Sequence, residues 1–371
     1  MKNILYISNE DHVVGGSSLS LLAMLQALKG EVHPTILFRE DGPAADRFRG
    51  EGYECVVIPF RKVVFHSKGI KRVIRFIPHL ITTALVRSRC VRKCKRLFKY
   101  IEAVHTNSST VDIGLDIARA LNVPHIWHIR EYMDLGLHFQ PFPSWKHWHR
   151  KLAASDCVIA ISPGLFNHLH LERHRNAICL PDAVCSASDA VLIKEKEPYI
   201  AFLSGSICDI KRPDEAIRIF ASAKTEGFRL KLTGNIDSEM KGRLDALAES
   251  LGVNDRIDYL PFTKDVKKLL SKASAVLVCT EFEGMGRVAI EAMFYGCPVI
   301  ARNSGGSADV LENGPYGKLY NTVAEAAEKM NEVLHVFPLE NVEAALNYAI
   351  KNFSIEDYRQ KILNVYSRVC N

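Results

Sequence analysis

The sequence predicts an α/β protein with two doubly wound domains, and three observations carry that prediction. Short β-branched runs alternate with helical segments through the first half of the chain. Residues 182–198, rich in small and charged side chains, then interrupt the pattern as a hinge would, and the alternation restarts at Tyr199. Such alternation indicates parallel sheets covered by helices on both faces. The chain has 371 residues, 47% of them hydrophobic, which is enough for two separate cores.

The expected strands are short apolar runs between these helical segments. In the first domain we expect them at residues 3–8, 33–38, 55–59, 103–106, 125–129 and 157–161, and in the second at 199–203, 230–233, 257–260, 275–279 and 299–301.

The most informative stretch links the last two of these strands. Residues 287–295 have apolar side chains at helical spacing, with Gly286 before them and Gly296 and Pro298 as the expected stop. The first turn of such a helix exposes unpaired backbone N–H groups at the carboxyl end of a parallel strand. Those groups favour an anion, typically a phosphate.

Two acids lie in the same stretch. Glu283 is in the loop, where open α/β sheets bind ligands, and Glu291 follows inside the helix. A phosphate repels a carboxylate, so we expect Glu291 to accept hydrogen bonds from sugar hydroxyls. Alternatively, Glu291 pairs with Arg287 one turn earlier on a solvated face, a contact worth about 0.2–0.5 kcal/mol. The residues alone leave both interpretations open.

The pattern Glu283-Gly-Met-Gly-Arg-Val-Ala-Ile-Glu291, followed by Gly296-Cys-Pro-Val-Ile and by Ser304-Gly-Gly-Ser-Ala-Asp309, resembles the signature of family 4 retaining glycosyltransferases of the GT-B fold. The resemblance implies two Rossmann-like, doubly wound domains facing across an interdomain cleft. Residues 1–185 would form the acceptor-side domain and residues 186–354 the nucleotide-sugar donor domain. The helix at 355–369 would pack back on the first domain.

The resemblance also implies roles for residues of the second domain. Glu291 would bind the ribose of a nucleotide sugar, Glu283 would contact the donor sugar, and the helix start would bind the diphosphate. In the family, an arginine and a lysine five residues later also grip the diphosphate. Lys211 fits the lysine, but Ser206 stands where the arginine is expected. The implied donor-binding set is Lys211, Gly234, Gly286, Arg287, Val288 and Glu291.

In the first domain, the pair Gly15-Gly16 follows the first strand and precedes a helical pattern, which makes another anion-ready helix start. It lacks the Gly-x-Gly-x-x-Gly spacing of a dinucleotide site. The resemblance implies a loop that closes over the donor diphosphate, and the alternative is a turn that needs positive φ.

Two histidines, His105 and His128, stand at the carboxyl ends of expected strands. A lone histidine is more often structural than catalytic. The resemblance makes His128 a catalytic residue beside the reacting carbon, together with Glu283, and gives His105 a supporting role. We expect the adjacent Arg130 on the acceptor side.

The excess of positive over negative charge is local to residues 62–99 and their immediate surroundings. From Cys55 to Ile101 there are thirteen Lys and Arg residues and no Asp or Glu, against a net charge of +6 for the whole chain. Basic residues mixed with apolar ones suit amphipathic helices on an anionic membrane. A solvated helical face is the alternative. Nucleic acid is disfavoured because no recognisable module is present and few aromatic residues could stack on bases.

We expect a cytoplasmic protein that binds peripherally to the inner face of the membrane through residues 62–99. The start of the chain has no signal-peptide pattern, and no apolar run is long enough to span a bilayer. The ten cysteines are scattered and are expected to be thiols. No Asp-x-Asp occurs, so we expect no essential metal and no cofactor other than a UDP- or GDP-linked donor.

The predicted function is therefore that of a retaining glycosyltransferase. It would move a sugar from a nucleotide diphosphate to a glycan acceptor, which would be lipid-linked or a precursor of cell-surface polysaccharide. Two alternatives stay open: a nucleotide-sugar epimerase of the same fold, and a non-catalytic, two-lobed ligand-binding protein.

Overall fold

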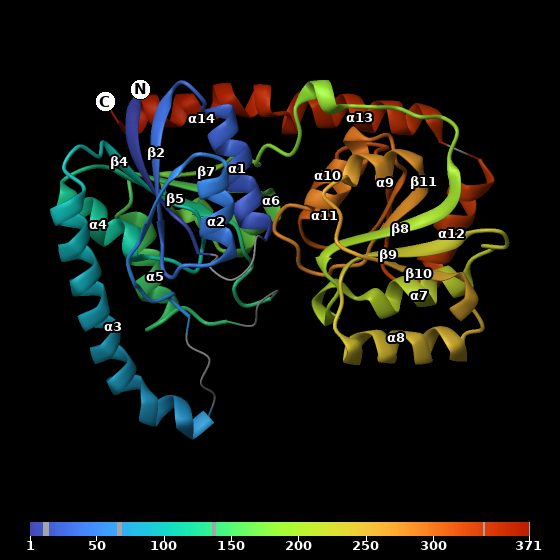
Figure 1. Cartoon of the computed structure of the whole chain (residues 1–371), viewed down its shortest axis with the longest axis horizontal. Helices are drawn as coiled ribbons and strands as arrows, with labels where there is room; N and C mark the ends of the chain where they lie inside the picture. Colours follow the sequence, from blue (N-terminus) through green and yellow to red (C-terminus); the bar gives the residue numbers. More distant parts are fainter. Residues whose placement is uncertain (10–14, 65–68, 136–138, 337, 371) are drawn as a thin grey trace. The chain divides into compact units, whose positions relative to one another are not determined.

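The computed structural model describes residues 1–9, 15–64, 69–135, 139–336 and 338–370. The chain divides into two compact units (Figure 1). Unit 1 consists of Met1–Ala183 and Tyr358–Asn371, and unit 2 of Val184–Asp357.

The described part of unit 1 contains a parallel sheet of seven strands in the order β3-β2-β1-β4-β5-β6-β7. Three of its strands, β4, β5 and β6, are buried along their whole length, as their continuous apolar patterns require of central parallel strands. The strands are β1 (Lys2–Ile7), β2 (Val32–Phe38), β3 (Glu54–Val57), β4 (Ala103–Thr106), β5 (His125–Ile129), β6 (Cys157–Ala160) and β7 (Ala177–Cys179).

Helices flank this sheet, and short polar side chains define where some of them begin. Ser144 and Ser162 each accept a hydrogen bond from a first-turn amide, the N-cap contact that stabilises a helix by about 1 kcal/mol. The helices are α1 (Gly16–Ala27), α2 (Pro43–Gly50), α3 (Gly69–Leu97), α4 (Ile113–Leu121), α5 (Trp145–Ala153), α6 (Pro163–His168), the 3₁₀ helix η1 (Leu171–Arg173) and α14 (Ile355–Val369).

The last helix, α14, follows unit 2 in sequence but packs in unit 1 from Tyr358 onward. Tyr358, Ile362 and Tyr366 are buried. Arg359 donates to the carbonyl oxygen of Ala27 at 2.7 Å, beside the end of α1. The chain therefore returns to unit 1 through its final helix.

The described part of unit 2 contains a second parallel sheet, with six strands in the order β10-β9-β8-β11-β12-β13. Its core gathers apolar side chains from the strands and from helices α7, α8 and α12. The strands are β8 (Glu197–Ser206), β9 (Arg229–Asn235), β10 (Ile257–Leu260), β11 (Ala273–Val278), β12 (Val299–Arg302) and β13 (Lys318–Tyr320).

The helices of unit 2 again begin at capping residues. Asp237, Asp265 and Thr322 accept hydrogen bonds from amides in the first turns of α8, α9 and α12. The helices are α7 (Pro213–Ser222), α8 (Ser238–Ser250), α9 (Val266–Lys272), α10 (Arg287–Phe294), α11 (Gly305–Leu311), α12 (Val323–His335) and α13 (Leu339–Phe353), with 3₁₀ helices η2 (Ala187–Asp189), η3 (Asp209–Lys211) and η4 (Asn254–Arg256).

The predicted fold class is confirmed, since both units are parallel sheets covered by helices. Sequence analysis did not foresee β7 and β13, which are three-residue edge strands. It also expected several helices in residues 62–99, whereas α3 is a single helix of 29 residues that contains Pro78. Residues 65–68 of that segment lie outside the described residues.

Replacing Ile362 by alanine tests whether α14 stabilises unit 1. Ile362 is fully buried, so the truncation should lower the free energy of unfolding by about 2–5 kcal/mol. Ser367→Ala on the exposed face of the same helix should change it by less than about 0.5 kcal/mol. Denaturant unfolding followed by circular dichroism measures both, and equal effects would contradict a stabilising role for the buried face of α14.

Candidate active site

Several of the predicted site residues follow strands at the places where the two strand orders reverse. In unit 2 the reversal falls between β8 and β11, and in unit 1 between β1 and β4. Open α/β sheets bind ligands at the carboxyl ends of such strand pairs. Lys211 follows β8, and Glu283 follows β11. Gly15 and Gly16 follow β1.

The loop after β11 packs backbone to backbone against the start of α11. The amide of Gly306 donates to the carbonyl oxygen of Glu283 at 2.7 Å. A Cβ atom on Gly306 would overlap the backbone of Met285, and one on Gly286 would lie 2.7 Å from the amide nitrogen of Ser307. Gly286 also has a φ of 76°, which favours glycine. The close approach therefore requires glycine at both positions.

Helix α10 begins directly after this contact. Gly286 is its N-cap and offers no side chain to the first turn. Arg287 and Val288 are the first two residues of the helix, so their amides belong to its first turn. They form an anion-ready end at the carboxyl edge of the sheet.

Arg287 and Glu291 form an ion pair. The Nε group of Arg287 donates to Oε1 of Glu291 at 3.0 Å, and its Nη2 group donates to the carbonyl oxygen of Val184 at 3.2 Å. The pairing left open by the sequence thus exists. Burial raises the pKa of Glu291 although Arg287 opposes the shift, and the charge of Glu283 raises it further. Ribose binding by Glu291 stays a prediction.

Glu283 and Lys211 meet at the same edge. The Nζ atom of Lys211 lies 3.5 Å from Oε1 of Glu283. The second carboxylate oxygen, Oε2, is buried without a hydrogen-bond partner. Buried carboxylate oxygens are normally hydrogen-bonded, so this atom has unused capacity for a hydroxyl donor.

Ser206 ends β8, where the resemblance implied an arginine, and it brings no charge. The alternative cations that the sequence offers are already paired. Arg212 contacts Glu215 at 2.8 Å and Glu281 at 3.4 Å, and Arg287 contacts Glu291. A bound diphosphate would therefore share its cations with carboxylates.

Gly234 lies near the end of β9 with a φ of 152°. A Cβ atom there would overlap the carbonyl oxygen of Ser204 on the neighbouring strand β8. The glycine thus keeps the two strands in close contact beside the loop that carries Lys211.

In unit 1, Gly15 and Gly16 begin α1, and residues 10–14 before them lie outside the described residues. Gly15 has a φ of −96°, so the alternative of a positive-φ turn is wrong for this residue. Among the described residues, no atom would lie within 4 Å of a Cβ atom on Gly16.

Glu131, directly after β5, has a carboxylate held by three donors. They are the amide of Ser109 at 2.8 Å, the hydroxyl of Ser108 at 2.9 Å and the side-chain amide of Asn9 at 3.3 Å. Burial raises the pKa of Glu131 in spite of these bonds. The carboxylate thus joins the ends of β1, β4 and β5.

His128 lies in β5, just before this edge of the sheet, and has no exposed surface. Its Nδ1 atom lies 2.8 Å from Nε2 of His105, and its Nε2 atom lies 3.9 Å from Oδ1 of Asp182. His105 is equally buried, in a position that supports His128. Direct contact between His128 and a donor sugar stays a prediction.

Arg130 lies on the same strand face as His128, one step nearer the edge. It pairs through Nη1 with Asp182 and donates through Nε to Asn107 at 2.9 Å, while its buried Nη2 group has no hydrogen-bond partner. Sequence analysis placed Asp182 in the hinge, but it is buried in unit 1, and Asn107 was not singled out. Asp182 follows β7 and Asn107 follows β4, so a polar residue placed after a strand is the sequence signal that could have identified both.

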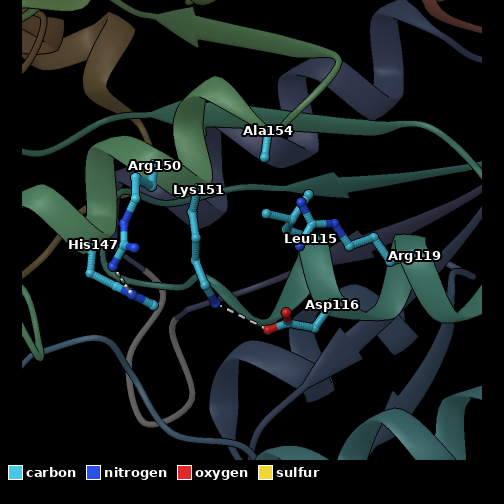
Figure 2. Close-up of a pocket in the computed structure, with 7 residues that line it drawn as sticks. All are labelled: Leu115, Asp116, Arg119, His147, Arg150, Lys151 and Ala154. Carbon is cyan, nitrogen blue, oxygen red and sulfur yellow. Dashed lines mark hydrogen bonds and ion pairs between the residues drawn. The ribbon is translucent and has the colours of Figure 1, made fainter.

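A cavity of about 360 Å³ opens between α4 and α5 in unit 1 (Figure 2). Lys151 reaches across it to Asp116 at 3.1 Å. None of the predicted site residues lines it, so it is separate from the candidate site. Its lining is Leu115, Asp116, Arg119, His147, Arg150, Lys151 and Ala154.

Within the described residues, no group of three His, Cys, Asp or Glu side chains has an arrangement that could hold a metal ion. A bilayer-spanning helix, long and apolar enough, is likewise absent from the described part of the chain. The ten cysteines are free.

Comparison with solved structures confirms the GT-B fold. The structure of Anabaena HepE in complex with UDP and glucose matches with a TM-score of 0.78 at 16% identity, covering 99% of this chain and all of that one. An identity this low shows the fold alone.

At the level of sequence, residues 186–351 match the family described as glycosyl transferases group 1. The predicted resemblance is thereby confirmed. D-inositol 3-phosphate glycosyltransferase of Mycobacterium sp. (strain JLS) is 30% identical over 195 residues, which cover 51% of this chain and 44% of the relative. N-acetyl-alpha-D-glucosaminyl L-malate synthase of Bacillus anthracis is 25% identical over 229 residues, 58% of this chain and 59% of the relative. The chain thus matches less than two thirds of either relative's length.

The raised pKa of Glu291 predicts a pH-dependent stability. A carboxyl group whose pKa is higher in the folded state binds its proton more tightly there, so its contribution is present at low pH and lost as the pH rises. Glu291→Gln should therefore gain stability relative to wild type as the pH rises from about 4, near the ordinary glutamate pKa, toward neutrality. Thermal unfolding across this range measures the difference, and an advantage that shrinks with rising pH would contradict burial as the cause of the shift.

Proposed function

We propose that the chain is a glycosyltransferase that takes a sugar from a UDP- or GDP-linked donor and transfers it with retention of configuration. The observation that carries the proposal is the arrangement of side chains and backbone amides at the carboxyl edge of the second sheet. There α10 has a start that is ready for an anion and carries Glu291. The loop before it carries Glu283, whose Oε1 atom lies 3.5 Å from the cation of Lys211. The family match of residues 186–351 supports it.

The chemistry breaks the bond between the anomeric carbon and the diphosphate oxygen, and the acceptor hydroxyl oxygen then takes that place. Negative charge gathers on the leaving diphosphate, so donors fixed beside it lower the barrier. One well-placed donor is typically worth about 2.7–4 kcal/mol. We assign this role to Lys211 and to the amides of Arg287 and Val288. The free Oε2 atom of Glu283 would accept a hydroxyl of the donor sugar.

We assign Glu291 to the ribose. Its Oε1 atom is paired with Arg287, and that contact holds the carboxylate in place for hydroxyl donors. Gly16 has no described atom within 4 Å of where a Cβ atom would lie, and we assign it to the approach of the diphosphate to the start of α1. The epimerase alternative is separated from transfer by product analysis without an acceptor, and the non-catalytic alternative by any hydrolysis of the donor.

A thermal-shift screen with UDP- and GDP-sugars tests the donor site. A ligand at 100 times its Kd should stabilise the chain by about 2.7 kcal/mol. Glu291→Ala should weaken the best ligand by about 1.5–3 kcal/mol, roughly 10- to 150-fold in Kd, because charged hydrogen bonds are lost. Glu312→Ala, an exposed acid after α11, is the matched control. Equal affinities for both variants would contradict the assignment.

We further propose that α3 holds the protein against an anionic membrane, where a lipid-linked acceptor would be reached. Four apolar side chains at helical spacing, Ile77, Leu80, Ile81 and Leu85, are 65%, 43%, 54% and 52% exposed. Exposed basic residues continue the same helix: Arg89, Arg92, Lys93, Lys95 and Arg96.

The second half of α3 contacts the rest of unit 1. Cys90 and Cys94 are buried against the core of unit 1, and Arg87 pairs with Asp112 at 2.6 Å. Figure 1 shows the first half of α3 extending beyond the sheet. The apolar stripe is therefore available to acyl chains, and each basic residue near an anionic leaflet can add about 1 kcal/mol.

Cosedimentation with vesicles tests this contact. Wild type should bind vesicles rich in phosphatidylglycerol, bind phosphatidylcholine vesicles poorly, and be released by salt. The double variant Ile77→Ser and Ile81→Ser should lose most of the binding, whereas Leu251→Ser, which alters an exposed apolar residue of unit 2, should not. Full binding by the double variant would contradict the docking proposal.

A further inference from the structure

Four buried side chains form a hydrogen-bonded chain inside unit 1, which we call the tyrosine–histidine chain: Tyr6, Tyr366, His105 and His128. The hydroxyls of Tyr6 and Tyr366 lie 2.9 Å apart, Tyr366 Oη lies 2.7 Å from Nδ1 of His105, and Nε2 of His105 lies 2.8 Å from Nδ1 of His128. The four side chains have at most 2% of their surface exposed. The tyrosine–histidine chain joins α14 to strands β1, β4 and β5.

Both imidazoles of this chain are neutral. The nitrogens that face each other, Nε2 of His105 and Nδ1 of His128, cannot both carry a hydrogen at 2.8 Å, so the two rings are never charged together. Burial lowers the pKa of each ring well below the usual histidine value, and the nearby charge of Arg130 adds to the effect. Each ring therefore has one N–H group and one acceptor nitrogen.

Only two directions of donation are possible along the chain. In the first, Tyr6 donates to Tyr366, Tyr366 to Nδ1 of His105, and Nε2–H of His105 to Nδ1 of His128. The proton of His128 then lies on Nε2. In the second direction every bond is reversed, and the proton of His128 lies on Nδ1.

The two ends of the chain favour the first direction. In the second, Nδ1–H of His105 donates to the hydroxyl of Tyr366. Only one of the two tyrosine hydroxyl hydrogens can then be donated between Tyr6 and Tyr366, and the other has no acceptor within the tyrosine–histidine chain. At the other end, the lone pair on Nε2 of His128 would face the carboxylate of Asp182, whose Oδ1 atom is 3.9 Å away. An N–H group there is attracted by the same carboxylate.

We propose that the tyrosine–histidine chain fixes His128 as the tautomer with its proton on Nε2. His128 is then an N–H donor and cannot act as a base, and Tyr6, Tyr366 and His105 are positioning residues that act through it. This deepens the proposed function: a sugar oxygen that reached Nε2 would receive a hydrogen bond there. In the free protein that N–H group points toward Asp182, the ion-pair partner of Arg130.

Nitrogen-15 NMR of the full chain, labelled at histidine, tests the tautomer directly and needs no substrate. The expected spectrum has His128 protonated at Nε2 and unprotonated at Nδ1, with a coupling across the hydrogen bond from Nε2 of His105 to Nδ1 of His128. Assignment uses His105→Asn and His128→Gln. A wild-type spectrum with the proton of His128 on Nδ1 overturns the proposal.

Tyr366→Phe removes the donor to His105, and Tyr358→Phe is the matched control. Tyr358 lies on the same helix, and its buried hydroxyl has no hydrogen-bond partner. The histidine spectrum should change to a mixture of tautomers in Tyr366→Phe and remain that of wild type in Tyr358→Phe. An unchanged spectrum in Tyr366→Phe, or the same mixture in both variants, overturns the role of the chain.

Kinetic measurements test whether the tyrosine–histidine chain affects the reaction. Tyr366→Phe should lower kcat for donor turnover about tenfold with little change in the KM of the nucleotide sugar, whereas Tyr358→Phe should change neither. A fall in KM and kcat by the same factor in both variants contradicts positioning through His128. If the tautomer is as expected but no nucleotide sugar is turned over by wild type, the proposed function fails and the tautomer assignment stands.

Discussion

The contact between two glycine-containing loops in unit 2 is the constraint on which the candidate site depends. Gly306 lies against the backbone of Met285, and Gly286 against that of Ser307, so neither position has room for a side chain. The hydrogen bond from Gly306 to the carbonyl oxygen of Glu283 closes the contact. The start of α10 and the backbone of Glu283 are thereby held on the same edge of the sheet, where we propose that a diphosphate binds.

Much of this edge could be predicted because its determinants are local. The start and stop of α10 are encoded by Gly286 and Gly296, and the buried strand before it by a short apolar run. The edge strands β7 and β13 could not be found in this way, since three residues carry too little pattern. The structure has the single helix α3 where several helices were expected. It contains Pro78, a residue that disfavours a helix interior, and its Cys90 and Cys94 pack into the core of unit 1.

The polar interior of unit 1 was much harder to predict because its partners are distant in sequence. His105 is bonded to Tyr366 across 261 residues, and Arg130 to Asp182 across 52. The two histidines could be found from their places at strand ends. The tyrosines and the carboxylate of Asp182, which determine the direction of hydrogen bonding through the histidines, could not. Burial of so many polar groups is tolerated because most of them are hydrogen-bonded to one another. The same packing leaves His128 without exposed surface, so its chemical role depends on where its proton lies.

Hydrogen–deuterium exchange of the full chain, with and without a saturating nucleoside diphosphate, tests the central claim most directly. If the start of α10 binds the diphosphate, the backbone amides of residues 284–290 and of the facing residues 304–308 should exchange more slowly in the bound state. The exchange rates of the amides that line the cavity between α4 and α5 should be unchanged. Slower exchange at that cavity, with the amides at the start of α10 unchanged, would contradict diphosphate binding by this helix.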